Sequence, residues 1–117
     1  MLSENDKEAI RSVERVIEAM QALRCVLERR EATLRRAISA SEPVIDYAGA
    51  VKDAHVSEEQ EDLREALFQL EQCRRESRIA SFRSALDHGV SISELSRIWG
   101  FSRQMASRYA KEARGER

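Results

Sequence analysis

Apolar residues recur every three or four positions along most of this chain, which is the spacing of one face of a helix. The first run begins near Ser3, which is spaced with Asp6 as a helix cap, and meets no glycine or proline before Pro43. Its stripe consists of Ile10, Val13, Ile17, Met20, Leu27, Leu34 and Ile38. The pattern predicts a helix of about 37 residues, about 55 Å long.

A helix of that length cannot be buried within a monomer of this size, so we expect it to be an oligomerisation arm. Arg24 and Glu31 interrupt its stripe, while Val16 and Leu23 widen it beyond the seam of a two-stranded coiled coil. This width suits a helix that packs on two neighbours. Residues 28–36 are nearly all charged, and we expect them to extend into solvent as a rod.

A proline and a glycine divide the rest of the chain. Pro43 ends the first helix, and a short helix is predicted over residues 44–55. No helix breaker lies between residue 57 and Gly89, so we expect one connecting helix there. Its last turns carry one apolar stripe, formed by Ile79, Phe82 and Leu86.

Residues 89–114 predict two short helices joined by a tight turn. Ser91 and Glu94 form a capping box for the first helix, and Gly100 ends it because glycine adopts left-handed angles most easily. Ser102 caps the second helix. The expected buried face of that helix consists of Ala106, Tyr109, Ala110 and Ala113.

The opposite side of the second helix is polar and predicts double-stranded DNA as a partner. Its candidate DNA-binding residues are Ser102, Arg103, Gln104, Ser107, Arg108 and Lys111. Arg and Gln make bidentate bonds to guanine and adenine in the major groove, and the helix start penetrates deepest, so Arg103 and Gln104 are the expected base contacts. Ser107 is placed for a base or a phosphate, and Arg108 and Lys111 for phosphates. An ordinary helical hairpin with solvated arginines is the alternative.

Residues 78–114 resemble the helix-turn-helix domains of resolvase and invertase recombinases and of small bacterial helix-turn-helix regulators. The resemblance rests on the stretch GVSISELSRIWGFSRQMASRY. It implies a three-helix DNA-binding domain whose recognition helix, residues 102–113, reads the major groove. It places five residues at the DNA-facing start of that helix, namely Ser102, Arg103, Gln104, Ser107 and Arg108. Ala106, where Val or Ile is usual, and Trp99, where Leu is usual, depart from the pattern.

Charge follows the same division of the chain. Residues 78–117 carry eight Lys or Arg and four Asp or Glu, whereas residues 1–77 carry twelve and seventeen. We therefore predict an oligomerisation arm over residues 1–77 and a DNA-binding domain over residues 78–117. The basic excess is modest, so one copy should bind weakly and a homodimer more strongly.

Other chemistry is thinly represented. Cys25 and Cys73 are isolated, so we expect no metal site and interpret both as small core residues in a reducing cytosol, with a disulfide across a dimer as the alternative. His55 and His88 are expected at the surface or beside helix C-termini. The carboxylates are spaced as solvated faces, so we expect neither an enzyme nor a cofactor.

These patterns together predict an all-α, cytoplasmic protein without a membrane segment. We expect a dimeric transcriptional regulator or a phage or plasmid maintenance factor. The alternative is an adaptor whose N-terminal arm binds the coiled coil of a partner protein.

Overall fold

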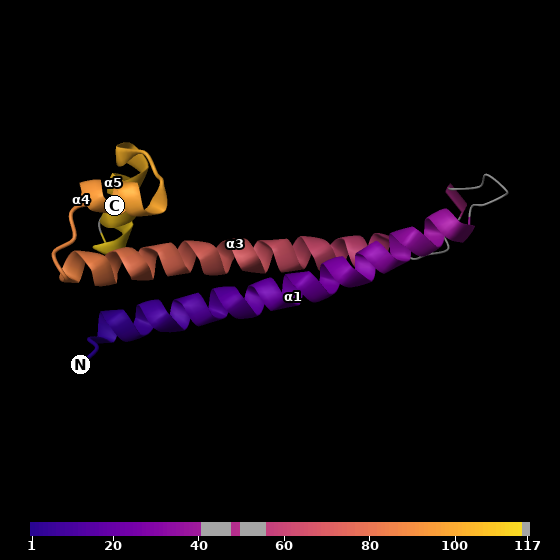
Figure 1. Cartoon of the computed structure of the whole chain (residues 1–117), viewed down its shortest axis with the longest axis horizontal. Helices are drawn as coiled ribbons and strands as arrows, with labels where there is room; N and C mark the ends of the chain where they lie inside the picture. Colours follow the sequence, from indigo (N-terminus) through magenta and orange to yellow (C-terminus); the bar gives the residue numbers. More distant parts are fainter. Residues whose placement is uncertain (41–47, 50–55, 116–117) are drawn as a thin grey trace. The chain divides into compact units, whose positions relative to one another are not determined.

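The computed structural model describes residues 1–40, 48–49 and 56–115, and its long elements are all helices. They are α1 (Glu4–Ala40), α3 (Val56–Asp87), α4 (Ile92–Trp99) and α5 (Arg103–Ala113) (Figure 1). The predicted all-α class is confirmed for this part of the chain. The short helix predicted over residues 44–55 lies almost wholly outside the described residues.

α1 begins as the sequence predicts, and both long helices continue without interruption as predicted. The backbone N–H of Ser3 donates to Asp6 Oδ2 at 3.1 Å, and the backbone N–H of Asp6 donates to Ser3 Oγ at 3.1 Å. This reciprocal cap starts α1, which has the predicted 37 residues. α3 runs for 32 residues without interruption, which confirms the predicted connecting helix.

The described residues form two compact units. The first consists of Met1–Ile17 with Gln72–Arg117, and the second is Glu18–Glu71. Each unit contains one portion of α1 and one portion of α3. The predicted boundary between residues 77 and 78 stays a prediction.

In the second unit, the highly charged part of α1 packs on α3 rather than extending into solvent. Thr33 is buried, and its hydroxyl donates to Glu59 Oε1 at 2.7 Å. Arg29 forms an ion pair with Asp62 at 3.0 Å, and Ala37 is buried. The expectation of a solvated rod is therefore wrong. The expectation failed because small residues of α1, spaced one or two helical turns apart, are enough to let a second helix pack against it.

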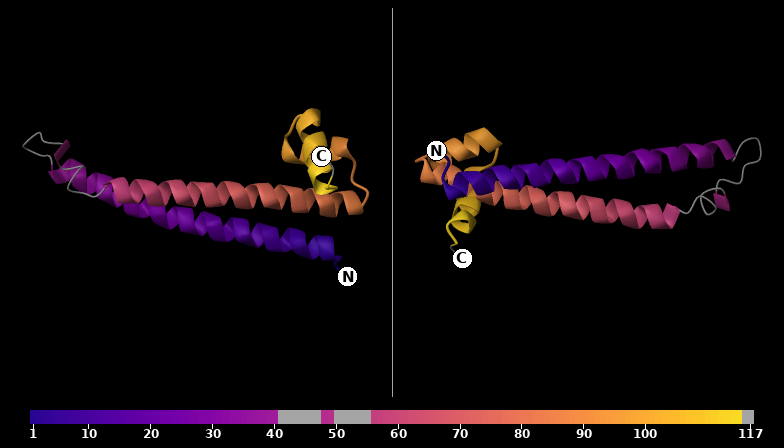
Figure 2. Two further views of the ribbon diagram at one scale, coloured as in Figure 1. Left: turned by 180° about the vertical axis from the view of Figure 1, so that it is seen from behind. Right: turned by 90° about the horizontal axis from the view of Figure 1, so that it is seen from below.

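In the first unit, the first turns of α1 lie beside the last turns of α3 (Figure 2). Asp6 Oδ1 accepts a hydrogen bond from Ser84 Oγ at 2.5 Å, and Nε2 of His88 lies 3.0 Å from the same oxygen. Asn5 also donates to Asp87. The donors from Ser84, the Ser3 backbone and His88 hold the pKa of Asp6 well below its usual range. His88 is exposed as expected, but it has a partner that its local sequence did not indicate.

The stripe predicted on α1 is the face that the chain leaves open. The exposed large side chains of this helix are Ile10, Val13, Ile17, Met20, Leu27 and Ile38. The buried residues of this helix are instead small or polar: Asp6, Ser12, Thr33 and Ala37. Cys25 is exposed and Cys73 is half-buried, so the interpretation of Cys25 as a core residue is wrong. It lies on a side of α1 that no other helix of the described chain covers.

The largest side chains buried by the chain lie where α3, α4 and α5 meet. Phe82, Leu95, Ala106 and Ala110 are at most 1% exposed, and Ala113 joins them. Ile79, Leu86 and Tyr109 pack against this cluster, which confirms the stripes predicted on α3 and α5. The rings of Phe82 and Tyr109 are inclined by 64°, with 5.7 Å between their centroids.

Candidate nucleic-acid interface

The turn between α4 and α5 is held by hydrogen bonds at each step. Ser91 Oγ accepts from the backbone N–H of Glu94 at 3.2 Å, which caps α4 as predicted. Gly100 has the left-handed φ of 70° expected of it, and its N–H donates to the Ser96 carbonyl. Ser96 Oγ in turn donates to the Phe101 carbonyl at 2.6 Å. The direction in which the chain leaves α4 is therefore fixed by hydrogen bonds to backbone groups.

α5 is anchored at both of its ends. Ser102 Oγ accepts from the backbone N–H of Met105 at 3.1 Å, which is the predicted N-cap. At the other end, Arg83 of α3 donates from Nε to the Ala113 carbonyl at 2.8 Å. The buried face between these anchors consists of three small residues, Ala106, Ala110 and Ala113. Their size lets α5 lie close to the aromatic core and directs its other side outward.

The outward side carries every candidate DNA-binding residue. Ser102, Arg103, Gln104, Arg108 and Lys111 are exposed, and Ser107 is half-buried. Arg103, Gln104 and Ser107 surround a shallow hollow of about 450 Å³, together with Ile92 and Ser93 of α4. Arg108 and Lys111 lie outside this hollow, farther along α5. The structure thus gathers the expected base contacts in one place.

Charge on this face is not neutralised by the part of the chain that the structure describes. Arg103 Nη2 donates to the neutral hydroxyl of Ser93 at 3.0 Å, which orients the guanidinium and leaves its charge in place. Among the described residues, no ion pair involves Arg103, Arg108 or Lys111, and the first turn of α5 has no acidic side chain. The N-terminus of α5 adds the partial positive charge of its backbone N–H groups. The face therefore suits a polyanion.

Sequence reasoning missed three residues of this surface. Ile92 and Ser93 belong to α4 and reach the hollow only because the turn places α4 beside the start of α5. Met105 is 41% exposed and follows Ser102 by three positions, so it flanks the same side. That spacing was visible in the sequence, whereas the contribution of α4 was not.

A cluster of Ser84, Asp6 and His88 contains the residue types of a hydrolase triad in a different order. A triad places histidine between serine and the carboxylate. Here the carboxylate is in the middle, and both Ser84 and His88 contact Asp6. The cluster therefore ties α1 to α3. Among the described residues, no group of three or more His, Cys, Asp or Glu is placed to hold a metal ion, and no helix is long and apolar enough to cross a membrane.

Comparisons with known proteins neither support nor contradict the candidate interface. No protein-family model matches the chain, and neither the curated proteins nor the solved structures contain a match to it. The resemblance of residues 78–114 to recombinase and regulator domains stays a prediction that rests on the quoted residues.

Proposed function

We propose that this chain is a sequence-specific DNA-binding protein in which α4 and α5 form a helix-turn-helix supported by the last turns of α3. One observation carries the proposal. α5 presents Arg103, Arg108 and Lys111 as exposed side chains, and none of them is in an ion pair with a described residue. A helix that was only part of a hairpin would gain from acidic partners for these charges.

The dimensions of α5 fit the major groove. A helix with its side chains is about 10–12 Å in diameter and the groove is about 12 Å wide, so α5, with 11 residues, can lie in it with its start deepest. Arg103 and Gln104 are then the base-reading residues, with Ser107 beside them. Arg108 and Lys111 neutralise phosphates, which sets position rather than sequence preference.

The proposed active form is a homodimer. Ile10, Val13 and Ile17 are each 43–48% exposed on one side of α1, and a second copy of this stripe is an apolar surface of matching spacing. Two DNA-binding domains joined in this way read two half-sites, which lie in successive major grooves about 34 Å apart or farther. The expected DNA site is an inverted or direct repeat, and the role is that of a transcriptional regulator or a phage or plasmid maintenance factor.

The test begins with genomic fragments retained by the purified protein at two salt concentrations. A repeated sequence that survives the higher salt identifies the site and its spacing. With that site, the double variant Arg103→Ala/Gln104→Ala should bind at least about thirtyfold more weakly, because each bidentate base contact contributes about 1–3 kcal/mol. Its mass by light scattering should not change. No retention of DNA at either salt, or a variant that loses its oligomer instead, contradicts the proposal.

A matched pair of lysine variants tests whether Lys111 contacts phosphates, which position the protein, rather than bases, which set its sequence preference. Lys111→Ala should weaken binding to all sequences alike and reduce the salt slope by about one. Lys7→Ala removes another exposed charge from α1, where Lys7 pairs with Glu4 at 3.4 Å, and should leave the slope unchanged. Equal slopes for the two variants would mean that Lys111 does not contact DNA.

The exposed stripe on α1 also favours a second function, that of an adaptor. An amphipathic helix from a partner protein would cover Ile10, Val13 and Ile17 as well as a second copy would. This function predicts a monomer in isolation and no retained DNA. The measured mass of the free protein therefore distinguishes it from the proposed dimer.

A further inference from the structure

The hollow between α4 and α5 has one apolar wall, formed by Ile92. This residue is half-buried: it packs against the buried cluster that includes Phe82, and the rest of its side chain borders the hollow. The other residues that line the hollow are polar, namely Ser93, Arg103, Gln104 and Ser107. A phosphate alone would satisfy these polar groups and leave Ile92 uncovered. The hollow therefore fits a ligand that presents a small apolar group beside hydrogen-bonding groups.

The guanidinium group at the hollow is oriented by a contact within the protein. Arg103 Nη2 donates to Ser93 Oγ at 3.0 Å, which holds the guanidinium beside the residue that follows Ile92. This bond uses one of five guanidinium donors. The others can still form the bidentate pair with O6 and N7 of guanine that the proposed function assigns to Arg103. A guanine bound in this way has its neighbouring base pair next to the apolar wall of the hollow.

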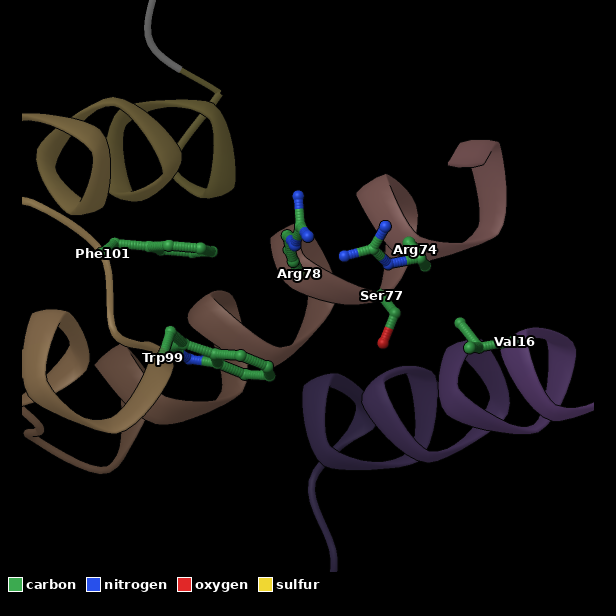
Figure 3. A pocket seen from close by; sticks show the side chains of 6 residues that line it. All are labelled: Val16, Arg74, Ser77, Arg78, Trp99 and Phe101. Atoms are coloured by element: carbon green, nitrogen blue, oxygen red, sulfur yellow. The ribbon is translucent and has the colours of Figure 1, made fainter. Parts of the chain in front are cut away.

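Contacts at the turn fix how α4 and α5 lie relative to each other. The rings of Trp99 and Phe101 are within 15° of parallel, with their centroids 6.4 Å apart (Figure 3). Cζ of Arg78 lies 5.3 Å from the centroid of the Phe101 ring, and Nη1 of Arg78 donates to the Tyr109 hydroxyl at 3.2 Å. These contacts join α3, the turn and α5. The hollow is thus preformed, and a ligand that fits it does not have to order it.

Building on the DNA binding proposed above, we propose that this hollow receives the 5-methyl group of a pyrimidine next to the guanine bound by Arg103. Ile92 is then a specificity-determining residue. In the major groove, thymine presents an acceptor, O4, and a methyl group, and proteins recognise that methyl group by apolar contact. Ile92 supplies the apolar surface, and the hydroxyl groups of Ser93 and Ser107 supply donors for O4. Thymine is therefore the expected base, and 5-methylcytosine presents the same methyl group.

The test uses the DNA site selected from amplified genomic fragments, because amplified DNA contains no 5-methylcytosine. Each half-site should contain a thymine next to a guanine. Deoxyuridine, which lacks only the methyl group, replaces each such thymine in turn. At one position per half-site the replacement should weaken binding about fourfold, which is the effect of leaving one methyl group unburied. At that position, a similar gain from 5-methylcytosine over cytosine means that either base supplies the methyl group, and no gain means that thymine alone does.

Two isoleucines of α4 provide matched variants. Ile92→Ala should bind the thymine and deoxyuridine duplexes equally, whereas Ile98→Ala, at a residue that is 69% exposed and not part of the hollow, should keep the preference. The preference is a ratio measured on one protein, so a lower folded fraction of a variant affects both duplexes alike.

Two results overturn the role of Ile92: a parent protein that binds both duplexes equally at every position, and an Ile92→Ala variant that keeps the preference. A parent that binds the selected site and is weakened by Arg103→Ala, but does not distinguish thymine from deoxyuridine, keeps the proposed function and loses only this inference. A parent that retains no DNA contradicts both.

Discussion

The core formed by α3, α4 and α5 and the buried face of α1 are built from opposite kinds of side chain. The first buries Phe82 and Leu95 completely and surrounds them with Tyr109 and other apolar groups. The second buries Asp6, Ser12, Thr33 and Ala37, while the large apolar residues of α1 face outward. One region therefore uses its hydrophobic residues to fold, and the other leaves them available to a partner.

This difference has a consequence for how each region is stabilised. Burying a Leu or Phe side chain contributes about 1.5–3 kcal/mol, whereas a neutral hydrogen bond contributes about 1 kcal/mol net. The α3–α4–α5 core thus depends on a few large side chains. The attachment of α1 depends on small residues and on contacts such as those of Asp6, and its free stripe offers additional stability once a partner covers it.

The largest effect is expected in the α3–α4–α5 core. Leu95→Ala should lower the free energy of unfolding by about 2–5 kcal/mol, because Leu95 is 1% exposed and belongs to the buried cluster that includes Phe82, so its removal leaves a cavity. Chemical denaturation followed by the fluorescence of Trp99 measures this change close to the mutation. Ile98→Ala, one turn along α4 and 69% exposed, is the control and should change stability by less than about 0.5 kcal/mol. Similar losses in the two variants would mean that α4 is not packed as described.

The next effect concerns the free stripe of α1. The triple variant Ile10→Gln/Val13→Gln/Ile17→Gln should weaken the predicted dimer at least about thirtyfold and leave the monomer folded, since these residues contribute little to intramolecular packing. Analytical ultracentrifugation over a range of concentrations measures the association. The double variant Glu18→Gln/Cys25→Ser, exposed on another side of α1, should associate like the parent. A triple variant that unfolds instead would place the stripe inside the monomer.

The same contrast explains which parts of the fold were predictable. Local signals were sufficient for the helix ends: the caps at Ser3, Ser91 and Ser102 and the left-handed Gly100 depend only on neighbouring residues. The buried alanines of α5 followed from spacing. The polar side of α5 followed in turn as the remaining face, so the candidate site could be proposed in advance.

Contacts between distant segments could not be predicted in this way. The bonds of Asp6 to Ser84 and His88 join residues about eighty positions apart, and no local pattern marks them. The α1 stripe was identified correctly as a helical face, but its hydrophobicity did not tell whether this chain or a partner covers it. Small residues such as Ser12 were not predicted to be buried, although two helices that pack closely need small residues where they touch.

A smaller effect is expected at the α4–α5 turn. Gly100→Ala should cost about 1–2 kcal/mol, because φ is 70° there and a side chain at that angle is strained. A Cβ at this position has no atom within 4 Å, so crowding adds nothing. Gly100→Asn should cost less than Gly100→Ala, since asparagine tolerates left-handed angles. Thermal unfolding of the three proteins gives the order, and an alanine variant as stable as the parent would show that the turn adopts another conformation.

The smallest change near neutral pH is expected from Asp6→Asn. The amide of asparagine has one acceptor oxygen where the carboxylate has two, so it keeps either the bond from Ser84 to Oδ1 or the bond from the Ser3 backbone to Oδ2, and the charge is lost. Because those donors and His88 lower the pKa of Asp6, its carboxylate stabilises the folded state above about pH 4, and this contribution is lost as the pH falls toward the lowered value. The parent should therefore be more stable than Asp6→Asn at neutral pH, and the two should converge between about pH 5 and pH 2. Denaturant unfolding across this range measures both curves; parallel curves would mean that the carboxylate does not hold α1 to α3, and that the small residues of α1 suffice.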